Sequence, residues 1–289
     1  PGGLFGSPGY GGPGFGSPMP FRILQGPRFR HTFLTSGSGN DRLQINDTDV
    51  SVAMAWANFL YGTQPLYVIP SFSLHLWEGP ITDGNITADL PASAYSAFLD
   101  FAYKTDPSRI LGAELGVRVG AFTDFDTFND DSVRVMGKGL GVLRLTPTTT
   151  LKLGVLYLDR NSVRLLPAGG IVYQPNPFSR YDIYFPNPKL SRYINTLGTN
   201  DIWGYLSGEF GGGVWTVQRS GGGTDEVDLN DIRIAAGLEW GQNQFIAAGR
   251  RTAFAEIGYV LNREVRYAAN PADNFDADDS FYIRVGIGY

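Results

Sequence analysis

The segment Phe281–Tyr289, FYIRVGIGY, decides the fold class of this chain. Large apolar or aromatic residues alternate in it with a phenol, an arginine and two glycines. In an extended strand this alternation places five side chains on one face, those of Phe281, Ile283, Val285, Ile287 and Tyr289. A soluble all-β edge strand can alternate in the same way. A transmembrane barrel strand also explains the aromatic end, because aromatic residues collect where such strands meet the membrane interface.

The same nine residues resemble the C-terminal signature of Gram-negative outer-membrane β-barrel proteins. The resemblance implies that these alternating residues are an assembly signal, recognised by the barrel assembly machinery of that membrane. It also implies a location in the cell outer membrane, in contact with lipid and lipopolysaccharide. The chain starts at Pro1 without a Met or a signal peptide, so we expect a processed, exported product.

Composition excludes several classes of protein. The chain has no Cys in 289 residues, so a disulfide framework and a thiolate metal site are excluded. A transmembrane helix is also excluded, since no run approaches about 18 consecutive apolar residues. Barrel strands escape that test because they are apolar only at alternate positions. The net charge of -5 argues against nucleic acid as a partner.

Period-2 alternation continues from about residue 26 to the end of the chain. Segments of about ten residues show it most clearly, at 94–104, 110–121, 232–240 and 253–261. Their polar faces hold Arg and Glu beside Gly, whereas a soluble sandwich would expose Thr, Lys and Ser. The sequence therefore predicts an all-β, antiparallel transmembrane barrel over 26–289.

The connections between strands predict the strand number. Short polar turns are expected at 62–65, 105–108, 146–148, 195–200 and 241–244. Longer segments are expected at 36–47, 78–93, 122–132, 159–178, 211–226 and 267–279. The two classes alternate, as periplasmic turns and external loops do in bacterial barrels, and predict about 12 strands within a range of about 10–14. An additional hairpin hidden in 159–178 would raise the number to about fourteen.

Segment 159–178 is apolar where the alternation predicts a loop. It contains Leu165, Leu166, Ile171, Val172 and Tyr173, which would be costly to expose together. We therefore expect it to fold into the barrel mouth, to extend strands above the membrane, or to contact a partner. The sequences LLPAGG, QPNP and FPNPK resemble an uncharacterised family of bacterial outer-membrane barrel proteins over about 150–215. That resemblance implies no activity and no catalytic residue.

Residues 1–25 form a separate Gly/Pro/Ser-rich arm, expected in the periplasm. Its sizeable apolar groups are Phe5, Tyr10 and Phe15, spaced by five residues. We expect them to insert into the periplasmic mouth of the barrel or into another protein chain, either a partner or a second copy. Ordering the arm otherwise costs about 1–2 kcal/mol per residue of backbone entropy.

The residues that could carry chemistry are few, and we expect no enzyme. Only two His are present, His31 and His75, and neither lies in a motif that pairs a nucleophile with an oriented base. The acidic segments 124–131 and 273–279 lack the spacing of an EF-hand loop, so solvated loops are expected there. The glycine clusters lack the strand–loop–helix context of a nucleotide site. No cofactor and no metal are predicted.

The remaining feature is the predicted lumen, where charged side chains are expected because each would cost about 2–4 kcal/mol on the lipid face. The lumen candidates are Asp100, Glu114, Arg118, Arg134, Arg144, Glu209, Arg233, Glu239, Glu256 and Arg284. They either line a water-filled pore for small polar solutes or pair into a network that closes the bore. The sequence therefore favours a porin-like pore and leaves open a non-conducting structural barrel that anchors partner proteins.

Overall fold

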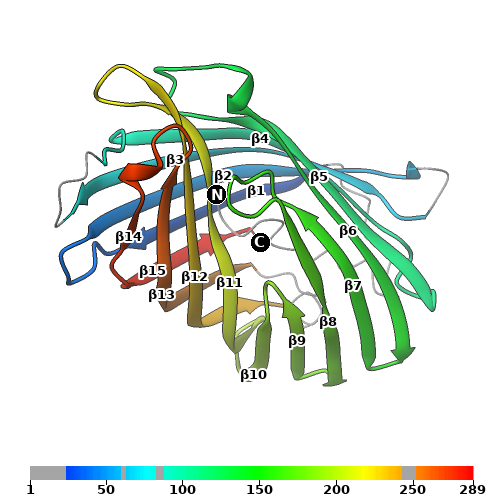
Figure 1. Ribbon diagram of the computed structural model, residues 1–289. Helices are drawn as coiled ribbons and strands as arrows, with labels where there is room; N and C mark the ends of the chain where they lie inside the picture. The colour runs from blue at the N-terminus through cyan, green and yellow to red at the C-terminus, as the bar shows by residue number, and fades with distance from the viewer. Residues whose placement is uncertain (1–23, 60–62, 83–87, 243–251, 289) are drawn as a thin grey trace.

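The computed structural model describes residues 24–59, 63–82, 88–242 and 252–288, which form a closed antiparallel β-barrel (Figure 1). The predicted arm, with Phe5, Tyr10 and Phe15, lies outside the described residues apart from its last two positions. So does Tyr289, the last residue of the expected assembly signal. Among the described residues, no helix is long and apolar enough to cross a membrane.

Fourteen strands form the wall, and a fifteenth, β14, is a short addition to the end of β13. The first seven are β1 (Leu24–Leu34), β2 (Arg42–Trp56), β3 (Leu66–Ile81), β4 (Ser93–Lys104), β5 (Leu111–Thr123), β6 (Val133–Thr146) and β7 (Thr149–Tyr157). The others are β8 (Leu165–Asn176), β9 (Ser179–Phe185), β10 (Lys189–Leu197), β11 (Asn200–Gln218), β12 (Thr224–Gly241), β13 (Ala253–Tyr267), β14 (Phe275–Ala277) and β15 (Ser280–Ile287). Strand β1 pairs with β15 from Phe29↔Ile287 to Leu34↔Tyr282 and closes the barrel.

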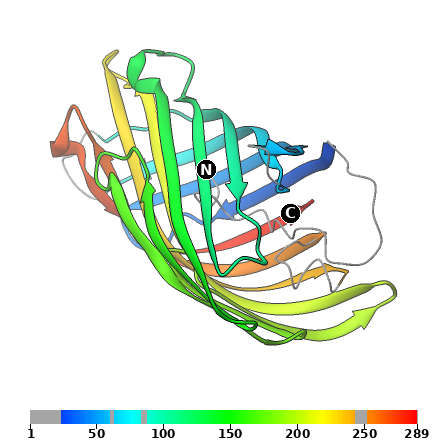
Figure 2. The ribbon, with the colours of Figure 1, turned by 90° about the vertical axis from the view of Figure 1, so that its right-hand side faces the viewer.

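The two ends of the barrel differ in their connections. We call the end that holds connections 35–41, 82–92, 124–132, 158–164, 186–188, 219–223 and 268–279 the loop end. The opposite end, with connections such as 147–148, 177–178 and 198–199 and with both described chain ends, is the turn end. In Figure 2 the green strands curve away from the blue and cyan ones, and the sheet encloses the interior between them.

The wall has 14 strands, the upper limit of the predicted range of about 10–14 and not its central value of about 12, because the additional hairpin considered for 159–178 is present. Strands β8 and β9 are joined by a two-residue turn at Pro177-Phe178. Prolines interrupt both strands or flank them, and β9 is only 7 residues long, so the alternation did not reveal either strand. The apolar residues that the sequence placed in a loop lie instead in β8.

The prediction of a long loop at 211–226 is wrong. Strand β11 continues to Gln218 and β12 begins at Thr224, so the connection is only 219–223. These two strands are the longest of the wall, at 19 and 18 residues. They project beyond their neighbours at the loop end.

The outer face of the wall is apolar, and the inner face is polar or tightly packed. In β15, Phe281, Ile283 and Ile287 are 59%, 54% and 57% exposed, whereas Tyr282 and Arg284 are buried. Exposed Leu, Ile, Val and Phe recur on the same face of β3, β5, β6, β7 and β12. A soluble protein rarely exposes so continuous an apolar surface, so the outer face requires an apolar environment.

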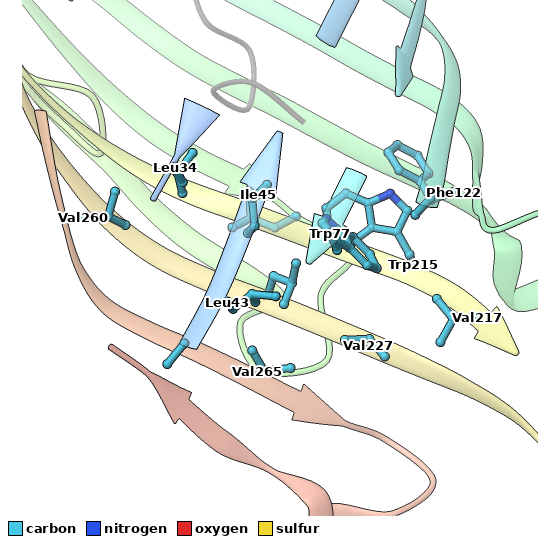
Figure 3. Packing of buried hydrophobic residues seen from close by; sticks show 14 of the residues in the cluster. Leu34, Leu43, Ile45, Trp77, Phe122, Trp215, Val217, Val227, Val260 and Val265 are labelled. Atoms are coloured by element: carbon cyan, nitrogen blue, oxygen red, sulfur yellow. The ribbon is translucent and has the colours of Figure 1, made fainter. Parts of the chain in front are cut away.

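The interior at the loop end holds a cluster of buried apolar side chains. Figure 3 shows members of this cluster from opposite sides of the barrel, including Trp77, Phe122 and Trp215. All three are at most 5% exposed. Toward the turn end this apolar cluster gives way to charged side chains such as Glu114, although the loop end also holds buried charges such as Arg134 and Arg160.

Candidate functional site in the barrel interior

All ten predicted lumen residues lie in wall strands, on the face opposite to the exposed apolar residues. Seven are buried: Glu114, Arg118, Arg134, Arg233, Glu239, Glu256 and Arg284. The other three are half-buried: Asp100, Arg144 and Glu209. The structure brings most of them into contact with a partner of opposite charge. Sequence reasoning did not identify those partners.

The largest network joins β11, β12, β13 and β15. Arg284 donates from Nη1 to Glu209 Oε2 at 2.9 Å and to Glu256 Oε1 at 2.8 Å. Arg233 binds Asp231 through Nε and Nη2 at 2.7 and 2.8 Å. Because charge-assisted and bidentate hydrogen bonds are the strong ones, this network fixes four neighbouring strands.

A second ion pair lies on the opposite wall, between β4 and β5. Arg118 donates to both oxygens of Asp100, at 2.6 and 2.9 Å. Its guanidinium also stands 3.9 Å from the centroid of the Phe98 ring. Both contacts hold the charge against the wall.

Glu114 is surrounded by three lysines from three different strands. Its carboxylate lies 2.7 Å from Lys152 Nζ, 3.5 Å from Lys104 Nζ and 4.0 Å from Lys138 Nζ. Sequence reasoning identified Glu114 and missed the lysines, since the alternation places them inward but does not give the strand register. We call these four residues the lysine cluster.

Four buried side chains form a hydrogen-bonded chain across the interior at the loop end. His75 Nδ1 lies 2.6 Å from Asp47 Oδ1, and His75 Nε2 lies 3.0 Å from Ser96 Oγ. Trp215 donates from Nε1 to the same Ser96 Oγ at 3.1 Å. The His75 and Trp215 rings are 4.9 Å apart in an edge-to-face arrangement.

The direction of this chain follows from its two ends. A carboxylate can only accept, so His75 donates to Asp47 from Nδ1. An indole N–H can only donate, so Ser96 Oγ accepts from Trp215, and its second partner is His75 Nε2. The sequence showed no nucleophile–base motif around His75. Its hydroxyl partner is Ser96 on the adjacent strand β4.

Trp215 belongs to a part of the wall that leaves the outer surface. Residues 211–217 of β11 and 225–231 of β12 are buried, almost without alternation, so both faces of these strands are covered. We call residues 211–231 the inner hairpin. Gly212 allows the bend, because its φ is +84° and a Cβ there would lie 1.8 Å from the Leu229 carbonyl oxygen.

The inner hairpin crosses the barrel and pairs with β5, from which it is separated by five strands in the sheet order. Thr216 and Thr123 form a parallel bridge, and Asp124 N–H donates to the Thr216 carbonyl at 3.3 Å. Asp124 Oδ2 accepts from Gln218 N–H at 2.6 Å. Asp124, which the sequence placed in a solvated acidic loop, therefore joins the two sides of the loop end.

Arg160 from the connection 158–164 holds the edge of the inner hairpin. Its guanidinium is 2% exposed. It donates to the carbonyls of Gly211 and Gly212 and to Asn230 Oδ1, each at 2.8 Å. These carbonyls lie above Lys189, the first residue of β10, where β11 loses its neighbouring strand. Arg160 thus takes the place of the missing strand.

Arg219 joins three connections at the outside of the loop end. It pairs with Asp89, with Asp225 at 3.0 Å and with Asp273 at 2.6 Å. Burial alone would raise the pKa of Asp89, but hydrogen bonds from Ser220 and Arg219 outweigh it and lower that pKa below the ordinary value. The pKa of Arg219 is raised, because its carboxylate partners outweigh its partial burial.

The structure also places the other candidates from the sequence. Leu165, Ile171 and Tyr173 lie on the exposed outer face of β8, whereas Leu166 and Val172 lie on its inner face. Phe281, Ile283, Val285 and Ile287 lie on the outer face of β15. In the part of the chain that the structure describes, no group of three or more His, Cys, Asp or Glu is arranged to hold a metal ion.

Comparison with solved structures finds similar chains, among them the two described below. No family model matches the chain, and no curated protein matches it. An outer membrane channel from Pseudomonas putida F1 aligns with a TM-score of 0.39 and 12% identity, over 90% of this chain and 92% of that one. The β domain of the Bordetella autotransporter BrkA aligns with a TM-score of 0.36 and 11% identity, over 91% of this chain and 99% of that one. At these values neither similarity carries an argument about activity.

Proposed function

We propose that the protein is an outer-membrane β-barrel of a Gram-negative bacterium and forms a pore for small polar solutes. We further propose that the described conformation is closed at its external end by the inner hairpin. The observation that carries the proposal is the contrast between the two faces of the wall. The outer face is apolar at alternate positions, and the inner face holds the charged networks.

The membrane location is supported by the free-energy cost of exposing the apolar outer face to water. Exposed apolar side chains on β15, β5 and β7 would contact water in a soluble protein, whereas lipid accepts them. A tilted strand needs about 9–11 residues to span a bilayer, and most strands of the wall are at least that long. We place the loop end outside the cell, because external loops are longer than periplasmic turns in bacterial barrels.

The closed state is supported by the packing of the inner hairpin. Trp215 packs edge-to-face against Trp77, with ring centroids 5.2 Å apart, and donates to Ser96. Arg160 and Asp124 hold the edges of the hairpin. The contacts of the hairpin with the far wall are made by side chains, one β-bridge and one backbone hydrogen bond, whereas its β12 half also pairs with β13 from Val227↔Tyr267 to Asn230↔Glu264. The closure between β1 and β15 uses none of these residues, so release of the hairpin would leave it intact.

Conductance across a planar lipid bilayer tests the proposal. We expect the refolded wild-type chain to show infrequent openings. We expect a variant in which residues 214–228 are replaced by a two-residue Asn-Gly turn to conduct persistently. Heat-modified mobility on gels confirms that both are folded. If both fold and neither conducts, the protein is not a pore.

A second candidate is a non-conducting structural barrel that anchors partner proteins. It is favoured by the pairing of the inner charges with one another and by the apolar cluster that fills the loop end. Its partner contacts would lie on the predicted arm and on the outer residues of β8. Two results together would favour this function. Neither the wild type nor the hairpin variant would conduct, and a partner protein would be cross-linked through Tyr173 in native membranes.

A further inference from the structure

We infer that the lysine cluster is an anion-binding site in the lumen, and that it gives the pore a preference for small oxyanions and carboxylates. The inference rests on the proposed pore, because only a conducting lumen turns binding into selectivity. It deepens that proposal by naming the class of solute.

The geometry concentrates positive charge on one part of the wall. Lys104, Lys138 and Lys152 come from β4, β6 and β7, and all three ammonium groups lie within 4.0 Å of the single carboxylate of Glu114 on β5. Three ammonium groups therefore share this one carboxylate. A structural ion pair for Glu114 would need only one lysine.

Neighbouring carboxylates are already bound to other cations. Asp100 on the same wall is held by both Nε and Nη2 of Arg118. Asp182 on β9 is held by Arg180 at 3.0 Å. These carboxylates therefore make their closest contacts with arginines and not with the lysines.

On the opposite wall the guanidinium groups are already held by carboxylates. Glu209, Glu256 and Asp231 bind Arg233 and Arg284, and Arg30 and Arg263 also interact electrostatically with Glu209 and Asp231. We therefore expect a solute anion in the lumen to contact the lysine cluster and not the arginine network.

The side chains of the cluster are reachable from the lumen. Those of Lys104 and Lys152 are 26% and 17% exposed, compared with 5% for Arg233 and Arg284. The cluster also lies toward the turn end, below the inner hairpin, because Lys104 ends β4 there and Lys152 is near the start of β7. The inner hairpin therefore does not lie between the cluster and the turn end.

The chemistry of lysine defines the class of ligand. An ammonium group is a strongly hydrated point charge with three rotatable donors, and it lacks the planar fork that selects bidentate geometry. Three such groups accept phosphate, sulfate or a carboxylate alike. We therefore expect weak binding with little discrimination between oxyanions, as conduction requires.

The test measures reversal potentials of the full chain in planar bilayers under a KCl gradient. We expect the wild type to favour Cl⁻ over K⁺. We expect the triple variant K104Q/K138Q/K152Q to reduce that preference about threefold or more. The triple Lys→Arg variant should retain it, and Lys189→Gln, a lumen lysine paired with Glu239 on the other wall, should leave it unchanged. A conducting wild type without anion preference would overturn the inference and leave the pore intact.

A second measurement decides the inference if the chain does not conduct, in which case the proposed pore fails. Acetylation of lysines by a water-soluble reagent is followed by mass spectrometry on the detergent-solubilised protein, with and without inorganic phosphate. We expect phosphate to slow the modification of Lys104 and Lys152 at least about twofold relative to Lys189. Equal rates with and without phosphate would show that the cluster does not bind anions.

Discussion

Replacing Trp215 by Phe is expected to loosen the inner hairpin while the apolar packing is kept. The phenyl ring retains most of the contact with His75 and Trp77, whose ring centroids lie 4.9 and 5.2 Å from that of Trp215. The indole N–H that donates to Ser96 Oγ is lost. A buried hydrogen bond contributes about 0.5–1.5 kcal/mol net.

That loss sets the size of the effect. Since about 1.4 kcal/mol corresponds to a factor of ten, the equilibrium between the seated and the released hairpin should shift about two- to thirteenfold. Trp215→Ala removes the ring as well, and a buried Trp→Ala change costs about 3–5 kcal/mol. The effect of Ala should therefore exceed that of Phe by at least about tenfold.

The assay is hydrogen exchange of the backbone amides of 213–229, with β13 and β15 as internal references. Ser96→Ala removes the acceptor of the same bond, so the double variant W215F/S96A should cost less than the sum of the two single changes. Additive effects would show that the bond does not hold the hairpin. Unchanged exchange in Trp215→Ala would refute the argument that this side chain seats it.

Three further outcomes follow from the same geometry. Gly212→Ala should destabilise the fold by about 1–3 kcal/mol or more, because the glycine has φ of +84° and its Cβ would lie 1.8 Å from a backbone oxygen. The control Gly221→Ala should not destabilise the fold, because nothing lies within 4 Å of the added Cβ. Unfolding by urea, followed on gels, compares the stability of the two variants. The lowered pKa of Asp89 means that its contribution to loop stability is fully present above the ordinary carboxyl pKa and is lost as the pH falls through its folded value. Proteolysis at 219–223 should therefore accelerate in acid in the wild type. The acceleration should be smaller in Arg219→Gln, in which Asp89 keeps only its hydrogen bonds from Ser220 and cleavage is already faster at neutral pH. Leu115→Arg on the outer face should destabilise the barrel folded in a bilayer by about 2–4 kcal/mol. A spin label at the same position should report lipid and not water.

How far the sequence predicts this structure depends on what covers each strand. In β15 and β5 one face meets the outside and the other the interior, so alternation alone identifies the strand and its inward side. Alternation cannot identify the inner hairpin, because adjacent residues such as Val214 and Trp215 are both buried. A segment covered on both faces has no period-2 signal, and its glycines resemble a loop.

The charged interior shows a different limit. The sequence identifies which charged residues lie on the inner face, since each strand supplies that information locally. Which residues meet depends on the register between strands, and a shift by one residue exchanges the faces. The partnership of His75 with Ser96 and the three lysines around Glu114 follow from register, so sequence reasoning missed them.

The prolines of β8 to β10 explain the wrong strand number. A proline removes a ladder donor and usually marks a turn or an edge, so Pro167 and Pro175 favoured a loop. In the structure they lie within β8, which has 12 residues, and the strands that follow it, β9 and β10, are short at 7 and 9 residues. The resemblance of this segment to outer-membrane barrel proteins implied the environment, and the sequence predicted the hairpin only as an alternative.

The most direct test of the central claim locks the inner hairpin in place with a disulfide between Thr123→Cys and Thr216→Cys. The chain has no natural Cys, and the two residues form a β-bridge. Bridged strands lie about 4.8 Å apart, within the Cα separation of about 4.4–6.8 Å that a disulfide accepts. We predict that the oxidised variant is silent in a planar bilayer and that a reductant restores openings in the same membrane. Equal conductance before and after reduction would contradict the claim that the inner hairpin closes the pore.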